Sequence, residues 1–146
     1  MPVDTQSIGK TFSPRLYAVG REKIREYALA VGETDPLYLD PEAARQAGHA
    51  DVVAPPMFAV VYSAPAMGPA IFDPQVGMNF AQMVHGGQEF QWPRLVTAGD
   101  EITTTVTVKD ISERDGRAYY LFETVSDNQS GERVCLGTWT NIVRGV

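Results

Sequence analysis

The clearest helical pattern lies in residues 21–31, where apolar side chains recur at spacings of three and four positions. This spacing predicts an amphipathic helix with one buried face, and Gly32 supplies a stop signal. A second, shorter helix is predicted to begin at Asp40 and Pro41 and to end at Gly48. Aspartate is a favoured N-cap, proline suits the first helical position, and glycine commonly follows a helix end.

A third helix is predicted over residues 57–64, which follow Pro55 and Pro56. This segment is apolar on all sides, and in a water-soluble protein such a helix is expected to be buried all round. The rest of the chain must therefore supply a layer of structure that surrounds it.

The surrounding layer is predicted from four segments with strand character, residues 82–92, 101–112, 117–126 and 132–143. In the second segment apolar residues alternate with threonines, which is the pattern of a strand with one packed face. Asp115-Gly116 predicts a tight hairpin turn. We therefore expect an α+β fold, one domain over residues 1–146, in which a curved antiparallel sheet wraps around a central helix.

Composition and charge exclude several classes of function. The chain has 146 residues and a net charge of −6, with Lys and Arg scattered along it. Nucleic-acid binding depends mainly on a positive surface, so it is disfavoured. The longest apolar stretch, residues 52–70, is interrupted by prolines, whereas a membrane helix needs about 20 largely uninterrupted apolar residues. Since no secretory signal opens the chain, we expect a cytoplasmic protein without membrane attachment.

The sequence contains no residue pattern typical of a metal site, a cofactor site or an intrachain disulfide. The single cysteine, Cys135, lies in an alternating segment and is interpreted as a core thiol rather than a nucleophile. The two histidines, His49 and His85, lack the spacing of metal ligands, and His49 is interpreted as a solvated loop residue. Trp92 and Trp139 are interpreted as packing residues on strands.

Three stretches carry a family resemblance. They are residues 19–28, residues 32–44, and the run His85-Gly86-Gly87-Gln88-Glu89-Phe90 followed by Pro93 and Ala98-Gly99-Asp100. Together they resemble the MaoC-like hydratase and dehydratase family, in the branch that has a single hot dog domain. That branch includes the small subunits of actinobacterial 3-hydroxyacyl-thioester dehydratases. The resemblance implies a hot dog fold and reversible addition of water to a 2-enoyl thioester of coenzyme A or acyl carrier protein, in fatty-acid metabolism.

The catalytic motif of that family reads Tyr-x-x-x-x-Gly-Asp-x-Asn-Pro-Leu-His, and its Asp and His perform the acid–base chemistry. By resemblance, Glu33 stands at the Asp position and Tyr38 at the His position. A phenol, with a pKa near 10 against about 6.5 for imidazole, is a poor base. Tyr38 is therefore a candidate acid or hydrogen-bond donor, or an aromatic packed at the mouth of the acyl site. Asp35 is either a second catalytic carboxylate or part of an Asx turn before Pro36.

Further candidate site residues lie at the start of the buried helix and on the first strand segment. Backbone N–H groups near Met57 and Phe58, just after Pro56, are candidates to polarise the thioester carbonyl. The alternative for these side chains is plain core packing. His85 is a candidate catalytic or substrate-binding residue, or a histidine satisfied in the core or at an interface. Gly86 beside it permits close approach of a ligand or another backbone.

Three functions stay open at this level. The first is a hydro-lyase, or a subunit of one, that acts on 3-hydroxyacyl or 2-enoyl thioesters. The second is a non-catalytic subunit that binds the acyl thioester while another chain supplies the Asp and His, an idea motivated by Tyr38. The third, an acyl-thioester hydrolase, has no distinguishing residue. The resemblance also implies a homodimer, or a heterodimer with a second hot dog subunit, which would cover an exposed edge strand.

Overall fold

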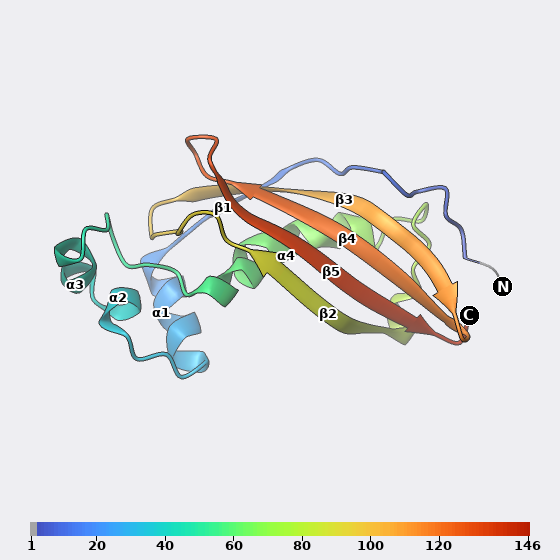
Figure 1. The fold of residues 1–146 in the computed structure, drawn as a ribbon, viewed down its shortest axis with the longest axis horizontal. Helices are drawn as coiled ribbons and strands as arrows, with labels where there is room; N and C mark the ends of the chain where they lie inside the picture. Colours follow the sequence, from blue (N-terminus) through green and yellow to red (C-terminus); the bar gives the residue numbers. More distant parts are fainter. Residues whose placement is uncertain (1–2) are drawn as a thin grey trace.

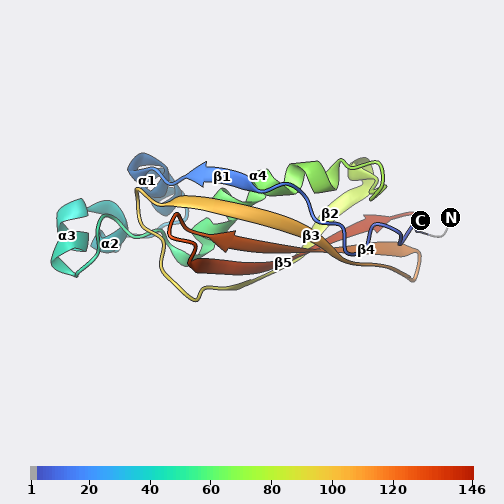
Figure 2. The ribbon, with the colours of Figure 1, turned by 90° about the horizontal axis from the view of Figure 1, so that it is seen from above.

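A computed structural model describes residues 3–146 as one five-stranded antiparallel sheet with helices on one face and at one end (Figures 1 and 2). The strand order across the sheet is β1-β3-β4-β5-β2. The strands are β1 (Arg15–Ala18), β2 (Met83–Gln91), β3 (Glu101–Arg114), β4 (Arg117–Asp127) and β5 (Arg133–Arg144). The curved sheet and its central helix confirm the predicted hot dog fold.

The helices fall into two groups. The longest, α4, runs along one face of the sheet, and three shorter helices gather at one end of it (Figure 1). Their bounds are α1 (Arg21–Ala30), α2 (Pro36–Leu39), α3 (Pro41–Gln46) and α4 (Ala59–Ile71), with 3-10 turns η1 (Pro56–Phe58) and η2 (Phe80–Gln82). The predicted caps of α3 are confirmed, because the Asp40 side chain accepts a hydrogen bond from Glu42 N–H and Pro41 is the first helical residue.

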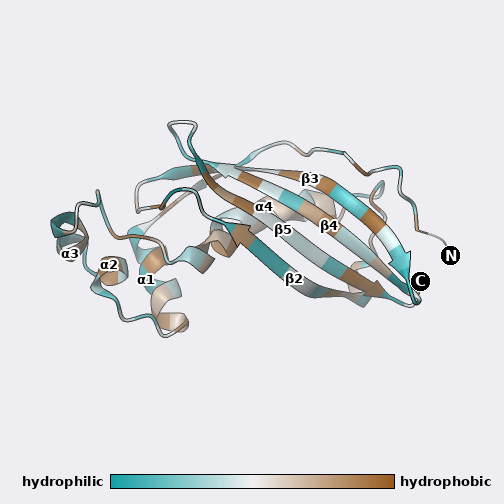
Figure 3. Ribbon diagram, viewed as in Figure 1, coloured by the Kyte–Doolittle hydropathy of each residue, from teal (hydrophilic) through white to brown (hydrophobic). Residues whose placement is uncertain are grey.

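Alternation along the long strands builds the core. Buried and half-buried residues alternate along β3, β4 and β5, and Figure 3 shows the same alternation of apolar and polar positions on β3. On β3, Ile102 and Val106 are buried against the helical layer, as the sequence pattern predicts. The Asp115-Gly116 hairpin is also confirmed: both residues have positive φ, 54° and 72°, as a type I′ turn requires.

The expectation that the central helix is buried on every side is wrong. Pro65 and Pro69 lie inside α4 and are exposed to solvent, and the helix is longer than predicted. The sheet covers only one face of the helix, so the opposite face meets water. Carbonyl groups there that lose a hydrogen bond to a proline can be hydrated, which explains why the helix tolerates both residues.

Two short elements were not predicted from the sequence. The four-residue strand β1 pairs with β3, yet none of its residues is fully buried, so it carries no alternation that would reveal it. The four-residue helix α2 is too short for a helical period and owes its start to a cap and a proline, Asp35 and Pro36. Trp92, predicted to pack on a strand, lies beyond the end of β2 and is 44% exposed.

Candidate functional site

A groove of about 450 Å³ lies between the end of α1, the turn after it and the start of the central helix. Its walls come from segments that are distant in the sequence, and its lining residues are Tyr27, Val31, Glu33, Pro55, Pro56 and Met57. Four of the predicted site positions therefore lie in or beside one hollow: Glu33, Pro56, Met57 and the adjoining Phe58.

The position of Glu33 is set by the way α1 ends. Gly32 has φ +78°, and its N–H donates to the Leu29 carbonyl oxygen at 3.3 Å. The N–H of Glu33 donates to the Ala28 carbonyl oxygen at 2.8 Å. These two hydrogen bonds form a Schellman motif, which needs a residue that accepts a positive φ at its turn. The motif stops the helix and places the exposed Glu33 carboxylate on the groove.

The phenols on both sides of Glu33 are poor bases. Burial raises the pKa of Tyr38 above its ordinary value, and the negative charges of Glu33 and Asp35 raise it further. The pKa of Tyr27 is raised by burial and by Glu33 in the same way. Protonated phenols donate hydrogen bonds, so Tyr38 can donate to a ligand but does not replace the imidazole base of the family motif.

Asp35 performs a structural task at the start of α2. One oxygen of its carboxylate accepts a hydrogen bond from Leu37 N–H at 2.9 Å, and Pro36 occupies the first helical position. This geometry is the Asx turn considered from the sequence. Asp35 does not line the groove that contains Glu33.

The start of the central helix offers one free backbone donor. The N–H of Phe58 donates to the Pro55 carbonyl oxygen at 2.9 Å, so it is occupied within the turn. The N–H of Met57 has no backbone or side-chain acceptor among residues 3–146. Of the two candidate donors, the structure leaves Met57 available, on the wall of the groove. Phe58 itself is fully buried, which agrees with its interpretation as a core residue.

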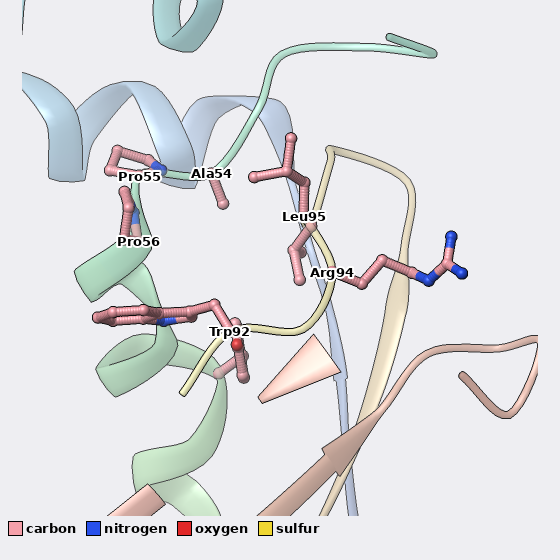
Figure 4. Close-up of a pocket in the computed structure, with 8 residues that line it drawn as sticks. Ala54, Pro55, Pro56, Trp92, Arg94 and Leu95 are labelled. Carbon is pink, nitrogen blue, oxygen red and sulfur yellow. The ribbon is translucent and has the colours of Figure 1, made fainter. Parts of the chain in front are cut away.

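A second, smaller pocket of about 70 Å³ opens on the other side of Pro55 and Pro56 (Figure 4). Its lining residues are Ala54, Pro55, Pro56, Tyr62, Trp92, Arg94, Leu95 and Val96. Ala54 N–H donates to the Val96 carbonyl oxygen at 2.8 Å, which ties the two walls together. The ring of Trp92 lies beside Pro56. From the sequence alone, Trp92 is predicted as a strand packing residue and is not named as a site residue. The one signal against strand packing is Pro93, which directly follows it and marks the end of the strand.

His85 and Gly86 do not join this site within one chain. His85 is exposed and lies near the start of β2, whereas Trp92 follows the end of that strand. The rise per residue of an extended strand separates the two residues by about 20 Å. Its ring packs against Trp139 with a centroid distance of 5.9 Å. Gly86 sits at a β-bulge, where a Cβ atom would lie 2.5 Å from Ile142 Cδ1. Close packing against Ile142 therefore explains the glycine without a ligand.

The remaining titratable candidates lie apart from the groove. Cys135 is buried, and burial raises the pKa of its thiol to about 11, as expected of a core thiol. His49 is half-buried after α3, less solvated than predicted. Across residues 3–146, no three His, Cys, Asp or Glu side chains group in a way that could hold a metal ion. Within the same residues, no helix is long and apolar enough to cross a membrane.

The fold and this site define a hot dog domain of the MaoC-like dehydratase class. A solved MaoC-like dehydratase superposes with a TM-score of 0.87 and 27% identity, over 97% of this chain and 43% of that longer chain. The HadBC (3R-hydroxyacyl-ACP dehydratase) complex from Mycobacterium tuberculosis contains a chain with a TM-score of 0.83 and 27% identity. That match covers 96% of this chain and 99% of the other. The predicted resemblance is thereby confirmed.

Sequence comparison gives the family. The sequence model described as "FAS1-like, dehydratase domain region" matches residues 6–136. A UPF0336 protein of Saccharopolyspora erythraea is 44% identical over 146 residues, which cover 99% of this chain and 94% of the relative. One from Clavibacter michiganensis is also 44% identical, over 99% of this chain and 98% of the relative. The chain therefore belongs to the UPF0336 family and carries a FAS1-like dehydratase region.

Proposed function

We propose that this chain is the acyl-thioester-binding subunit of a 3-hydroxyacyl-thioester dehydratase, and that a second hot dog subunit supplies the acid–base pair. One observation carries the proposal. Glu33, which carries a carboxylate, and Met57, whose backbone N–H is free, both line the groove, and no histidine is among its lining residues. Such a site can hold a thioester, while the proton transfers need a further group.

The free N–H of Met57 suits the carbonyl oxygen of a thioester. It lies at the start of the central helix, where backbone N–H groups point outward and the helix dipole favours negative charge. Negative charge develops on the thioester oxygen when a proton leaves Cα or when water adds to the double bond. A donor fixed in place stabilises that charge without having to reorganise.

The acid–base work is the part that this chain lacks. Dehydration removes a proton from Cα and donates one to the departing hydroxyl, so one group must accept and another must donate. The raised pKa of Tyr38 disfavours its use as the acceptor at neutral pH. The capping hydrogen bond of Asp35 to Leu37 N–H keeps that carboxylate in the turn. Glu33 alone remains, which supports assigning the complementary group to another chain.

The free edge of β2 supports a partner subunit. β2 is the last strand of the sheet, so one side of it has no strand to pair with among residues 3–146. The similar HadBC structure is a complex of two subunits. A second hot dog subunit against β2 would extend the sheet.

A second candidate function is a hydratase that acts without a partner. It is favoured by the Glu33 carboxylate, which lines the groove at the position of the family's catalytic Asp. In this version Glu33 alone would activate the water, and the proton donor would be a phenol: Tyr27, which lines the groove, or Tyr38, which does not.

The test is hydration of crotonyl-CoA by the purified chain, alone and mixed with a subunit that has the intact motif and is encoded beside its gene. The proposal expects ordinary enzyme rates only in the mixture. Efficient hydration by the chain alone would establish the second candidate instead. Glu33→Gln should then abolish activity, whereas the exposed control Glu42→Gln on α3 should leave it unchanged. If no mixture and no single chain hydrates or binds the thioester, the dehydratase assignment is wrong.

A further inference from the structure

We propose that the small pocket beside Trp92 receives the alkyl end of the acyl chain and limits the chain to about six carbons. The limit follows from comparing the volume of the pocket with the volume of cavities that hold small hydrocarbons. This inference rests on the proposed function, because it names the substrate length for the same site. Its evidence is the shape, the lining and the position of the pocket.

The pocket is closed at its inner end. Ala54, Tyr62 and Val96 form its floor, and their exposed fractions are 5%, 3% and 5%. The rim is formed by residues that solvent reaches, Trp92 and Leu95. An alkyl chain that enters at the rim therefore meets packed side chains and stops, instead of passing through the subunit.

The volume sets the length. The pocket measures about 70 Å³. A cavity of about 150 Å³ holds benzene, so roughly half that volume holds about three carbons. The carbonyl carbon and the two carbons of the double bond lie outside, near the Met57 N–H. Together these give a chain of about six carbons.

The lining selects hydrocarbon over the polar arm of the carrier. The Arg94 guanidinium is paired with Glu132 at 2.7 Å, and Figure 4 shows its side chain directed away from the pocket. The Tyr62 side chain is 3% exposed, and burial raises the pKa of its phenol. The amides of a pantetheine arm would lose their hydrogen bonds to water here and gain none, which is unfavourable. An alkyl chain loses nothing polar and buries apolar surface.

Pro55 and Pro56 connect the pocket to the thioester site. Both prolines line the groove that contains Glu33 and also line the pocket on their other side. Met57, with the free N–H, is the next residue along the chain. A thioester with its carbonyl at Met57 N–H can therefore extend its chain across Pro56 and into the pocket.

The experiment is a titration of the purified chain with butyryl-, hexanoyl-, octanoyl- and dodecanoyl-CoA. Calorimetry and tryptophan fluorescence measure the binding. Each buried methylene should tighten binding about fourfold, so hexanoyl-CoA should bind about 15-fold more tightly than butyryl-CoA. Octanoyl- and dodecanoyl-CoA should add less than about twofold, because their extra methylenes stay in water. The emission of Trp92 should change with the acyl ligands and not with free coenzyme A, and Trp92→Phe should remove that signal.

Variants that fill the pocket sharpen the test. Ala54→Val, and Val96→Leu as an independent second filling variant, should abolish the advantage of hexanoyl- over butyryl-CoA. Leu16→Ala, an exposed change on β1, should leave the series unchanged. Melting curves establish that each variant is folded.

Two results would overturn the inference. The first is affinity that keeps rising to dodecanoyl-CoA, and the second is an undiminished hexanoyl advantage in both folded filling variants. If either result is obtained while the two-subunit mixture still hydrates crotonyl-CoA, the length limit is refuted and the proposed function is not. If no acyl-CoA binds and the mixture is inactive, both fail together.

Discussion

Replacement of Phe58 by alanine should destabilise the protein more than any exposed aromatic change, because its ring joins three elements around the candidate site. Phe58 has no exposed surface. Its ring centroid lies 6.4 Å from that of Tyr17 on β1, 5.5 Å from Tyr27 on α1 and 6.3 Å from Tyr62 on α4. Loss of the ring removes contacts to all three elements at once.

The size of the effect follows from burial. Truncation of a buried phenylalanine to alanine costs about 3–5 kcal/mol, which includes the cavity left behind. An unfolding entropy of about 2.1 cal/mol/K per residue gives about 0.3 kcal/mol/K for the 146 residues. A loss of about 4 kcal/mol therefore lowers the melting temperature by about 13 °C. Since domains of this size have about 5–15 kcal/mol of stability, much of the total is at stake.

Thermal and urea melts followed by circular dichroism measure the change. The matched control is Phe72→Ala, because Phe72 is 65% exposed and its ring contacts only Phe80, at 4.9 Å between centroids, among the aromatic neighbours of residues 3–146. The control should cost less than about 1 kcal/mol. Equal effects of the two substitutions, or a shift for Phe58→Ala under about 3 °C, would refute the assignment of Phe58 as the packing centre of the site.

Four further outcomes are expected, at three residues. Asp35→Ala should cost about 1 kcal/mol in a urea melt because the cap on Leu37 N–H is lost, and Asp35→Asn should restore most of it. Gly137→Ala should cost about 1–3 kcal/mol, since a Cβ there would clash with Thr124 Oγ1, and a neutral melt would contradict this. Iodoacetamide should alkylate Cys135 slowly in the native protein and rapidly in urea. Because the fold raises the pKa of that thiol to about 11, its contribution to stability is complete below the unfolded pKa of about 8.5 and is lost as the pH rises toward 11, which urea melts across this range would detect.

The main architecture could be predicted because strong local signals agree with the tertiary structure. Alternation on β3 places Ile102 and Val106 in the core, and Asp40 with Pro41 starts α3 as expected. These signals depend on one residue and its immediate neighbours. The elements that were missed, such as β1, are held by pairing with a distant strand, so their own residues show no period.

The site was predictable only where the backbone determines it. Glu33 was named by its resemblance to the family motif, and the structure places it on the groove because the helix stop at Gly32 fixes the backbone directly before it. Trp92 could not be found in this way, and the sequence named the N–H groups near Met57 and Phe58 together without showing that only that of Met57 is free. Trp92 belongs to the site because the end of β2 meets the start of the central helix, and the Met57 N–H is free because Phe58 uses the Pro55 carbonyl. Both facts depend on contacts between segments or on single hydrogen bonds, which no sequence period records.

This difference explains why the turn after α1 identifies the family more firmly than the chemistry. Gly32, Asp35 and Pro36 determine the backbone: one accepts the positive φ, one caps α2 and one begins it. The N–H of Glu33 completes the helix stop whatever its side chain is. Folding alone requires this turn. If another subunit performs the proton transfers, as proposed, the side chains at Glu33 and Tyr38 are free to differ from Asp and His. The double change Glu33→Asp and Tyr38→His should therefore lower the melting temperature by less than about 6 °C, since Glu33 is exposed and Tyr38 is only half-buried. If crotonyl-CoA hydration by the lone chain then rises, the groove itself is competent and only its acid–base pair has been lost.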